Sequence, residues 1–219
     1  MKGKMTDSPN HEELNKRKWD RRAKIYDQKK RSGWLRFVQK RVTASLPLTE
    51  GVRFVDIGCG TGWAVYRVAE MANQRGEFYG VDLSTKMLEK AEENCAGLEH
   101  IHFLKANAES LPLEDDYFDI ALCTNSFHHY LNPLKALGEF HRILKDGGRL
   151  FIMEITADSR LMRLIDKKVA EKETEHVRFY STEEYREMYK ATGLEYVTSK
   201  VIAYPVKVHI AEKVGDDKQ

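Results

Sequence analysis

The segment Val55-Asp56-Ile57-Gly58-Cys59-Gly60-Thr61-Gly62 constrains the fold of this 219-residue chain more than any other part of it. Apolar residues lead to a carboxylate, and three glycines then follow at alternate positions. Glycine adopts positive φ at little cost and lets a ligand approach the backbone closely. The segment therefore predicts the end of a buried strand, a tight turn and the start of a helix, which is where open α/β sheets bind nucleotide-like cofactors.

The spacing of these glycines is G-x-G-x-G, and Trp63 follows them. Dinucleotide-binding folds use G-x-G-x-x-G instead, so the spacing argues against a nucleotide-dependent dehydrogenase. A glycine-rich loop by itself is weak evidence, and the rest of the chain has to decide between the possible cofactors.

Alternating apolar patterns predict strands and helices in turn through residue 155. We expect strands at 53–57, 77–81, 101–105, 118–123 and 149–154, with helices at 62–75, 84–94 and 131–144. Such alternation is typical of a parallel sheet. Strands at 195–203 and 206–211 are joined only by Tyr204-Pro205, and so short a link favours an antiparallel hairpin. The sequence predicts a Rossmann-like α/β fold with a seven-stranded, mostly parallel sheet that ends in an antiparallel hairpin, and with helices on both faces.

The remaining segments are predicted to be helical or without structure. Residues 1–10 are expected to be disordered, and helices are expected at 11–30 and 33–46, with a break at Ser32-Gly33. Residues 158–176 have an amphipathic helical pattern, and 181–191 begin with a capping-box pattern, Ser181 to Glu184.

Composition narrows the class of protein. The formal net charge is only +2, from 36 basic and 34 acidic residues, which argues against a general nucleic-acid binder. Basic residues nevertheless gather between Lys16 and Arg41. This is either a solvated helical face or a surface for an acidic substrate, an RNA or a lipid.

The cysteines and the N-terminus indicate a compartment. Cys59, Cys95 and Cys123 have no metal-ligand spacing, which suits reduced, buried thiols, and we expect no metal site. Residues 1–15 lack an apolar core of the signal-peptide type, and no apolar run approaches the ~18 residues that span a bilayer. A cytoplasmic protein without a membrane span is expected.

Four segments occur in an order that resembles the class I S-adenosylmethionine-dependent methyltransferases. The closest subset is similar to the ubiquinone/menaquinone biosynthesis C-methyltransferases and other small-molecule enzymes. The resemblance implies S-adenosylmethionine as cofactor and S-adenosylhomocysteine as product. The four segments are Val55–Gly62, then Gly80–Ser84 with Met87-Leu88, then Ala106–Pro112, and then Leu144–Leu150.

The resemblance also implies which residues bind the cofactor. The glycine loop would pass beside the methionine and ribose moieties, and Asp56 would reach the ammonium group or the loop amides; capping of the turn is the alternative role. Asp82 would accept hydrogen bonds from the ribose hydroxyls, or else cap the next helix. Asn107 stands where the family commonly has aspartate, and its carbonyl can still accept from the adenine amino group. The expected cofactor-binding set is Tyr26, Asp56, Gly58, Cys59, Gly60, Gly62, Asp82, Leu83, Met87, Asn107, Ala108, Glu109, Thr124 and Asn125.

Catalytic candidates follow the fourth and fifth strands. His128, His129 and Glu154 are the expected bases for an acceptor that must lose a proton. Two adjacent histidines on an extended backbone cannot both face one pocket, and we expect His128 to face it. A packed or solvent-exposed histidine is the alternative.

The expected organisation is an N-terminal helical lid, residues 1–46, on a methyltransferase domain, residues 47–219, in which 156–180 form a substrate-side insertion. In the resembling family an aromatic residue of the lid covers the cofactor, and Tyr26 fits this role. The expected activity is methyl transfer to a carbon, oxygen or nitrogen atom of a small-molecule acceptor, by a monomer or homodimer that has no nucleic-acid partner. The alternatives are an RNA or protein methyltransferase and a non-catalytic protein that binds the cofactor.

Overall fold

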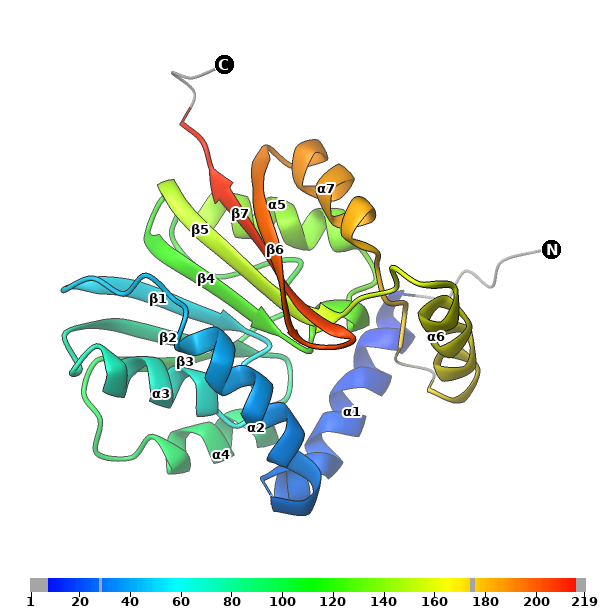
Figure 1. The fold of residues 1–219 in the computed structure, drawn as a ribbon. Helices are drawn as coiled ribbons and strands as arrows, with labels where there is room; N and C mark the ends of the chain where they lie inside the picture. The colour runs from blue at the N-terminus through cyan, green and yellow to red at the C-terminus, as the bar shows by residue number, and fades with distance from the viewer. Residues whose placement is uncertain (1–7, 28, 174–175, 216–219) are drawn as a thin grey trace.

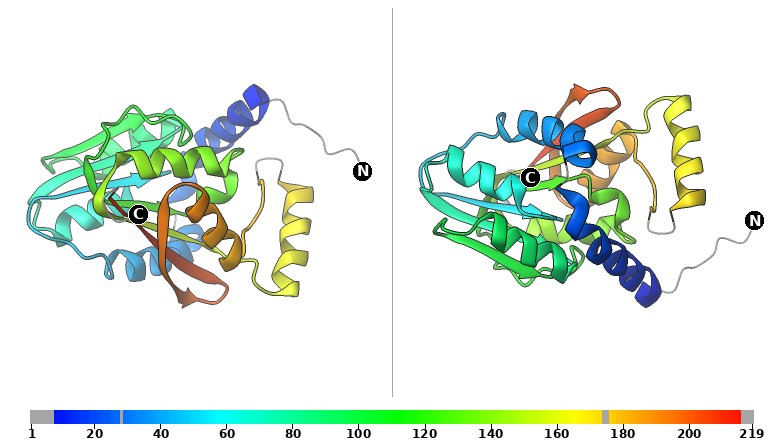
Figure 2. Two further views of the ribbon diagram at one scale, coloured as in Figure 1. Left: turned by 90° about the horizontal axis from the view of Figure 1, so that it is seen from above. Right: turned by 90° about the horizontal axis from the view of Figure 1, so that it is seen from below.

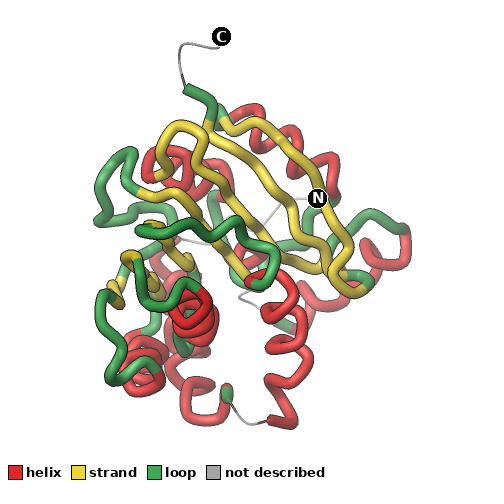
Figure 3. Tube along the Cα trace, turned by 60° about the vertical axis from the view of Figure 1, so that its left-hand side comes forward, coloured by secondary structure: helices red, strands yellow, loops and turns green. Residues whose placement is uncertain are grey.

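The computed structural model describes residues 8–27, 29–173 and 176–215. Its centre is a seven-stranded sheet with the strand order β3-β2-β1-β4-β5-β7-β6. Helices lie on both faces of this sheet (Figures 1 and 3). The predicted fold class is confirmed.

The strands pair as their order in the chain suggested. Neighbours from β3 to β5 are parallel, whereas β7 runs antiparallel to both β5 and β6. The hairpin at the end of the chain is therefore present, and Tyr204-Pro205 forms its turn. The strands are β1 (Val52–Ile57), β2 (Gly76–Asp82), β3 (Ile101–Lys105), β4 (Phe118–Thr124), β5 (Leu144–Ile155), β6 (Leu194–Ala203) and β7 (Val206–Lys213).

The helices divide between the two faces. Side chains of α2, α3 and α4 pack against one face, and those of α5 and α7 pack against the other. Helix α1 crosses the edge where the parallel strands end, and α6 stands to one side of the sheet (Figure 1). The helices are α1 (Ser8–Tyr26), α2 (Lys29–Thr43), α3 (Trp63–Met71), α4 (Thr85–Asn94), α5 (Pro133–Ile143), α6 (Arg160–Lys172) and α7 (Thr182–Ala191), with a short 3₁₀ helix η1 (Phe127–His129).

Both faces of the central strands are buried. In β1, Val55 and Ile57 join the core under α5 and α7, while Phe54 joins the core under α2 and α3. Successive side chains of a strand point to opposite faces, so a strand covered on both sides needs a continuous apolar run. Asp56 interrupts this run and is fully buried. A carboxylate at this position does not serve apolar packing, so Asp56 is a candidate functional residue.

The N-terminal region differs from the prediction. Ser8 to Asn10 belong to α1 instead of being disordered, and residues 1–7 lie outside the described residues. The first helix ends just before Asp27, whereas Gly33, at the predicted break, lies within α2. The Asp27 carboxylate pairs with Arg36 and accepts hydrogen bonds from Thr61 and Asn94. These tertiary contacts fix the turn at Asp27, and the glycine is tolerated in the helix at a cost of ~1 kcal/mol.

Two further boundaries differ. Helix α6 ends at Lys172, earlier than the predicted residue 176, and residues 174–175 lie outside the described residues. Strand β5 begins at Leu144, directly after α5, although we placed its start at residue 149. Gly147 has a φ of 76°, so the glycine pair bends the chain within the strand's span without ending it. The capping box at Ser181 and Glu184 is present as predicted.

Candidate cofactor and active site

A cavity opens at the carboxyl ends of β1, β2 and β4, beneath α1. Strands β1 and β4 are neighbours in the sheet, and the chain order reverses between them. Such a reversal leaves a crevice outside the strand ends, because the connections on its two sides lead to opposite faces. The cavity therefore lies where this class of fold binds its ligands.

The glycine loop forms the floor of the cavity. Gly58 has a φ of 79°, and a Cβ atom at this position would collide with the Ser126 side chain. The Gly58 and Cys59 N–H groups both donate to the Val81 carbonyl, at 2.7 and 2.9 Å, which ties the loop to β2. Only a residue without a side chain fits this close approach.

Asp82 ends β2 and connects the loop to α4. Its Oδ2 accepts a hydrogen bond from the Gly60 N–H at 2.8 Å, and its Oδ1 accepts one from the Ser84 N–H at 2.9 Å. Burial raises the pKa of Asp82, and these backbone hydrogen bonds oppose the rise. A carboxylate has about four lone-pair positions. Asp82 lines the cavity and can accept from ligand hydroxyls while it still holds the loop.

Asp56 lies behind the loop and is fully buried. Neither of its carboxylate oxygens has a hydrogen-bond partner among the described residues. Burial, followed by the charge of Asp82, raises the pKa of Asp56 to about 8. An unpaired buried carboxylate is costly. A cationic group bound close to the loop would relieve this cost, and the ammonium of a methionine moiety is such a group.

The far end of the cavity suits a purine. Leu83, Met87 and Ala108 line it with apolar surface. The Asn107 Oδ1 accepts from the Glu109 N–H at 2.9 Å and retains a second acceptor position. The Asn107 Nδ2 donates to Glu12 of α1 at 3.1 Å. Asn107 thus connects this end of the cavity to α1.

Helix α1 covers the cavity with aromatic side chains. The Trp19 ring lies 5.9 Å from the Tyr26 ring and 5.5 Å from the His129 ring, edge to face in both pairs. Burial raises the pKa of Tyr26 to about 12. Lys18 forms an ion pair of 2.6 Å with Glu173, and Asp20 accepts from the Ser84 hydroxyl at 2.6 Å. These contacts hold α1 against both sides of the cavity.

The end of β4 presents two polar residues to the cavity. The Thr124 hydroxyl accepts from the Gln39 side chain at 2.9 Å, and the Asn125 N–H donates to the Met153 carbonyl at 2.9 Å. Asn125 has a φ of 50°, in the left-handed region that asparagine tolerates better than most residues. Such backbone strain is common at binding sites.

The two adjacent histidines point in different directions. The backbone at 127–129 is a 3₁₀ helix instead of the extended chain that we assumed. His129 is buried and lines the cavity, whereas His128 turns toward β5, where its Nδ1 lies 2.9 Å from Glu154 Oε2. The structure thus places His129, and not His128, against the cavity. The two rings remain close, with 4.0 Å between their centroids.

A second acidic–histidine pair lies beside the first. The His176 Nε2 is 2.6 Å from Asp166 Oδ1, and the His128 and His176 rings are 5.4 Å apart. Phe179 packs against both of these rings. Neither Asp166 nor Phe179 was predicted from the sequence. No sequence signal pointed to Asp166, because it lies on the polar side of an amphipathic helix, and that side normally faces solvent.

The structure brings most of the predicted cofactor residues together. Asp56, Cys59 and Gly62 do not line the cavity, although all three belong to the strand and loop beneath it. Cavity residues of α1 other than Tyr26 were not predicted, although they lie in the helix expected at 11–30. The helical spacing of His11, Asn15 and Trp19 was the available signal. The predicted residues that line the cavity are Tyr26, Gly58, Gly60, Asp82, Leu83, Met87, Asn107, Ala108, Glu109, Thr124 and Asn125.

Comparison with known proteins assigns the family. Residues 48–195 match the methyltransferase domain family, which is more than half of the chain. The chain belongs to this methyltransferase family. A demethylmenaquinone methyltransferase of Staphylococcus aureus (strain MRSA252) is 30% identical over 138 residues, which cover 63% of this chain and 56% of that protein. The methyltransferase thus spans about half the length of the curated relatives that it matches.

Solved structures agree on the fold. A methyltransferase of Thermotoga maritima, described as a possible histamine N-methyltransferase, is 28% identical with a TM-score of 0.67, and the match covers 89% of this chain and 98% of that one. An S-adenosylmethionine-dependent methyltransferase of Aquifex aeolicus is 22% identical with a TM-score of 0.72, over 89% and 98% of the chains. A chain from the Haloferax volcanii complex of the Trm112 activator with a methyltransferase is 21% identical with a TM-score of 0.81, over 90% and 98%.

The family and these relatives indicate that S-adenosylmethionine is the cofactor of this class I methyltransferase. The cavity fits that molecule on the chain's own residues, because the glycine cradle and the Asp82 carboxylate line it. The buried Asp56 carboxylate, which has no hydrogen-bond partner among the described residues, lies behind the loop.

The described ranges offer neither a metal centre nor a membrane span. Within them, no group of three or more histidine, cysteine or acidic side chains is arranged to hold a metal ion. No helix in the same ranges has the length and apolar character needed to cross a bilayer. The three cysteines are free and buried, as expected.

Proposed function

We propose that this methyltransferase moves the methyl group of S-adenosylmethionine to a carbon, oxygen or nitrogen nucleophile of a small molecule, by in-line displacement. The observation that carries the proposal is the hydrogen-bonded pair of His128 and Glu154, which lies beside the cofactor cavity at the ends of β4 and β5. The names of two relatives, a demethylmenaquinone methyltransferase and a possible histamine N-methyltransferase, refer to small-molecule acceptors and support the same substrate class.

The cofactor residues have separate roles in this proposal. Asp82 accepts from the ribose hydroxyls, and Asp56 balances the ammonium of the methionine moiety. Asn107 and the Ala108 N–H bind the edge of the adenine, while Leu83 and Met87 cover its faces. All of these residues except Asp56 line one cavity, and Asp56 lies behind the glycine loop of that cavity, which supports the assignment.

The cofactor supplies an electrophilic methyl group on a sulfonium. The chain therefore has to align the acceptor and exclude water, and such positioning can lower a barrier by several kcal/mol. Trp19 and Tyr26 of α1 cover the cavity and exclude water from it. Residues 1–46 serve as the lid in this account, and 156–180 form the wall against which the acceptor lies.

His128 is the proposed general base. Glu154 is almost completely buried, with an exposed fraction of 1%, and it holds the Nδ1 side of the imidazole. This contact leaves Nε2 to take a proton from the acceptor. His129 lies against the cofactor side and shapes the boundary between the two ligands.

The test is methyl transfer by the purified full chain. The chain would be incubated with methyl-labelled S-adenosylmethionine and with panels of phenols, hydroquinones and amines, and release of S-adenosylhomocysteine would be measured. The proposal predicts turnover with at least one of these classes. Labelling of RNA or protein, with no small acceptor methylated, would contradict the substrate class and favour the macromolecular alternative.

A third outcome is binding without turnover. The fold of the [4+2]-cyclase SpnF resembles this one with a TM-score of 0.69 at 23% identity, so the fold alone does not establish methyl transfer. Tight binding of the cofactor, with no transfer to any acceptor, would favour a protein that binds the cofactor without catalysis.

A further inference from the structure

The most exposed large apolar side chains come from only three segments. Among the described residues, those more than half exposed are Trp34 (56%), Leu164 (58%), Val201 (59%), Leu161 (62%) and Tyr204 (69%). They belong to α2, to α6 and to the hairpin of β6 and β7. Single exposed apolar residues are normal on a protein surface, whereas a group of them marks an interaction site.

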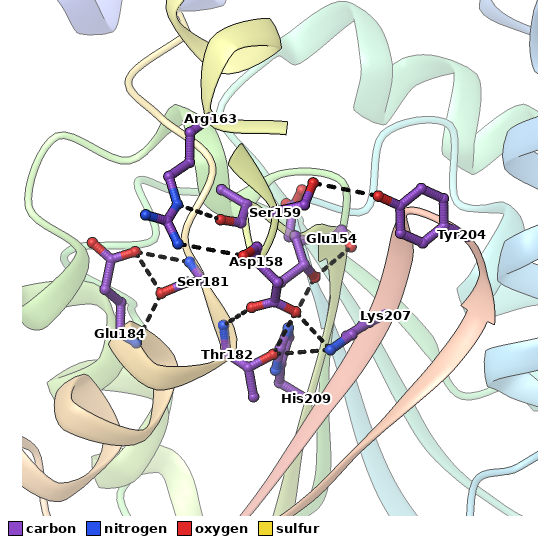
Figure 4. A network of polar contacts seen from close by, with 12 residues as sticks. Glu154, Asp158, Ser159, Arg163, Ser181, Thr182, Glu184, Tyr204, Lys207 and His209 are labelled. Atoms are coloured by element: carbon purple, nitrogen blue, oxygen red, sulfur yellow. Dashed lines mark hydrogen bonds and ion pairs between the residues drawn. The ribbon is translucent and has the colours of Figure 1, made fainter. Parts of the chain in front are cut away.

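These three segments lie along one side of the molecule. Both views in Figure 2 show α2, the turn of the β6–β7 hairpin and α6 in a row. The Tyr204 hydroxyl lies 3.4 Å from the Ser159 hydroxyl at the start of α6, and Lys207 pairs with Asp158 at 2.6 Å (Figure 4). On the other side of the turn, α2 packs against β6. We call the exposed apolar side chains of these three segments, taken together, the apolar face; they are Trp34, Phe37, Leu161, Leu164, Ile165, Val201 and Tyr204.

Helix α6 turns its apolar side away from the protein. Leu161, Leu164 and Ile165 are exposed, and Met162 is the buried residue of this helix. At 100° per residue, Lys168 falls on the same outward side as the leucines. The inward side holds Asp166, which accepts from the Phe179 N–H at 2.7 Å and pairs with His176. An amphipathic helix normally buries its apolar side against its own core, and this one does the opposite.

The two helices that contribute to the apolar face contain many more basic than acidic residues. Helix α2 contains no acidic residue, and Lys40 and Arg41 lie near its end. In α6, the acids are Asp166, which faces inward, and Glu171. The basic residues of α6 are Arg160, Arg163, Lys167, Lys168 and Lys172. The whole chain has a net charge of only +2, so the positive charge is concentrated here.

We propose that the apolar face docks on an anionic lipid surface. Aliphatic residues enter the boundary between headgroups and acyl chains, Trp34 and Tyr204 lie at headgroup level, and the surrounding lysines contact lipid phosphates. Long lysine side chains extend along apolar surface and keep their charge in water, so Lys168 fits among the leucines. The excess of basic residues in these two helices is the observation that selects a lipid surface over a protein partner or a second copy of the chain.

This inference stands apart from the proposed activity. The apolar face shares no residue with the cofactor cavity. Docking can be measured without cofactor or acceptor. A failure to detect methyl transfer would therefore not contradict the docking proposal, and a failure to detect docking would not contradict the proposed methyl transfer.

The test is flotation of the full chain with vesicles. Phosphatidylcholine vesicles with and without phosphatidylglycerol would be compared at low and high salt. We expect the chain to float with the anionic vesicles at low salt, to float less at high salt, and to stay unbound with neutral vesicles, because screening weakens attraction to the charged surface. No flotation with anionic vesicles would overturn the proposal.

Two variants locate the contact on α6. The triple variant Leu164→Gln, Ile165→Gln and Leu161→Gln should lower the partition coefficient at least about tenfold, because it removes the inserted apolar area. Lys167→Glu with Lys168→Glu should lower it at least about fivefold, since each cation near the surface contributes to attraction.

The matched control is Leu134→Gln with Lys135→Glu on α5, where Leu134 is 46% exposed on another face. Melting temperature and binding of S-adenosylhomocysteine would verify that each variant is folded. The proposal would be overturned if the control variant lowered the partition coefficient as much as the α6 variants do. It would also be overturned if the triple variant lost self-association, measured by light scattering, with no change in its partition coefficient. In that case the apolar face would be an interface between copies of the chain.

Discussion

Asp56 and Asp82, near the carboxyl ends of neighbouring strands, differ in what surrounds their carboxylates. Asp82 accepts backbone hydrogen bonds with both oxygens, whereas Asp56 has no partner among the described residues. The family resemblance predicted both carboxylates at the cofactor, with Asp56 just before the glycine loop and Asp82 at the end of the second predicted strand. Their different states could not be predicted, because they depend on how the glycine loop folds back over β2.

Replacement of Asp82 by alanine should weaken binding of S-adenosylhomocysteine at least about tenfold. Hydrogen bonds to a charged acceptor contribute ~1.5–3 kcal/mol each, and the variant loses both those from the ribose and that from the loop. Titration calorimetry measures the change. Asp119→Ala, at the start of β4 and so at the opposite edge of the sheet, is the control. An unchanged dissociation constant would contradict the ribose assignment.

The raised pKa of Asp56 predicts a pH dependence. The unfolded chain releases this proton near the ordinary aspartate pKa of 3.8, while the folded protein keeps it until about pH 8. Stability therefore decreases as pH rises through this window. The Asp56→Asn variant lacks this pH-dependent contribution. The difference in the free energy of unfolding, variant minus parent, should therefore increase by at least ~1 kcal/mol between about pH 5 and about pH 8.

Chemical denaturation at several pH values would measure that difference. Bound S-adenosylhomocysteine should reduce it, because its ammonium favours the charged carboxylate. A difference that stays constant with pH would mean that Asp56 is ionised and compensated in the free protein.

Replacement of His128 should affect turnover more than cofactor binding. General bases typically contribute about 10²–10⁴-fold to rate, and a loss in this range is expected for His128→Ala. Glu154→Gln keeps the shape of the side chain and removes the charge that faces the imidazole, so it should lower kcat with little change in cofactor affinity. Equal losses of turnover and affinity would assign both residues to the structure of the site.

Helix α1 is the element on which the closed cavity depends. It is held by contacts with residues far away in the sequence, among them Asp20 with Ser84 and Lys18 with Glu173. The central strands were predicted closely because continuous apolar runs define them. The break between α1 and α2 was predicted wrongly, because the partners that fix Asp27, such as Thr61 and Asn94, belong to other elements. Helix α1 also begins at Ser8, earlier than the predicted residue 11.

Loosening α1 should lower cofactor affinity without unfolding the domain. Asp20 accepts from the Ser84 hydroxyl and from the Lys86 N–H, at 2.6 and 3.2 Å. Asp20→Ala should weaken binding of S-adenosylhomocysteine about threefold to tenfold, as expected for the loss of one or two such hydrogen bonds. Protease cleavage near residue 27 should also become faster. Glu13→Ala removes an exposed ion pair on the same helix and should leave both properties unchanged.

At the scale of the whole molecule, the sheet order brings residues distant in sequence to one edge. Alternation of strands and helices, with a short final link, was enough to predict a mostly parallel sheet with a terminal antiparallel hairpin, whereas the strand order comes from the structure. On the proposed acceptor side, the sequence predicted only that residues 156–180 form an insertion. In the proposal, η1 and the end of β5 also belong to this side, and contacts such as His176 with Asp166 arise only in the folded chain.

The binding of S-adenosylmethionine in the cavity is central to every role assigned above, and titration calorimetry tests it most directly. The full chain would be titrated with S-adenosylmethionine, S-adenosylhomocysteine and, as control, NADH. We expect saturable binding of the first two and none of NADH, because the glycine spacing G-x-G-x-G differs from the G-x-G-x-x-G pattern of dinucleotide-binding folds. Binding of NADH, or no binding of either sulfur compound, would contradict this assignment.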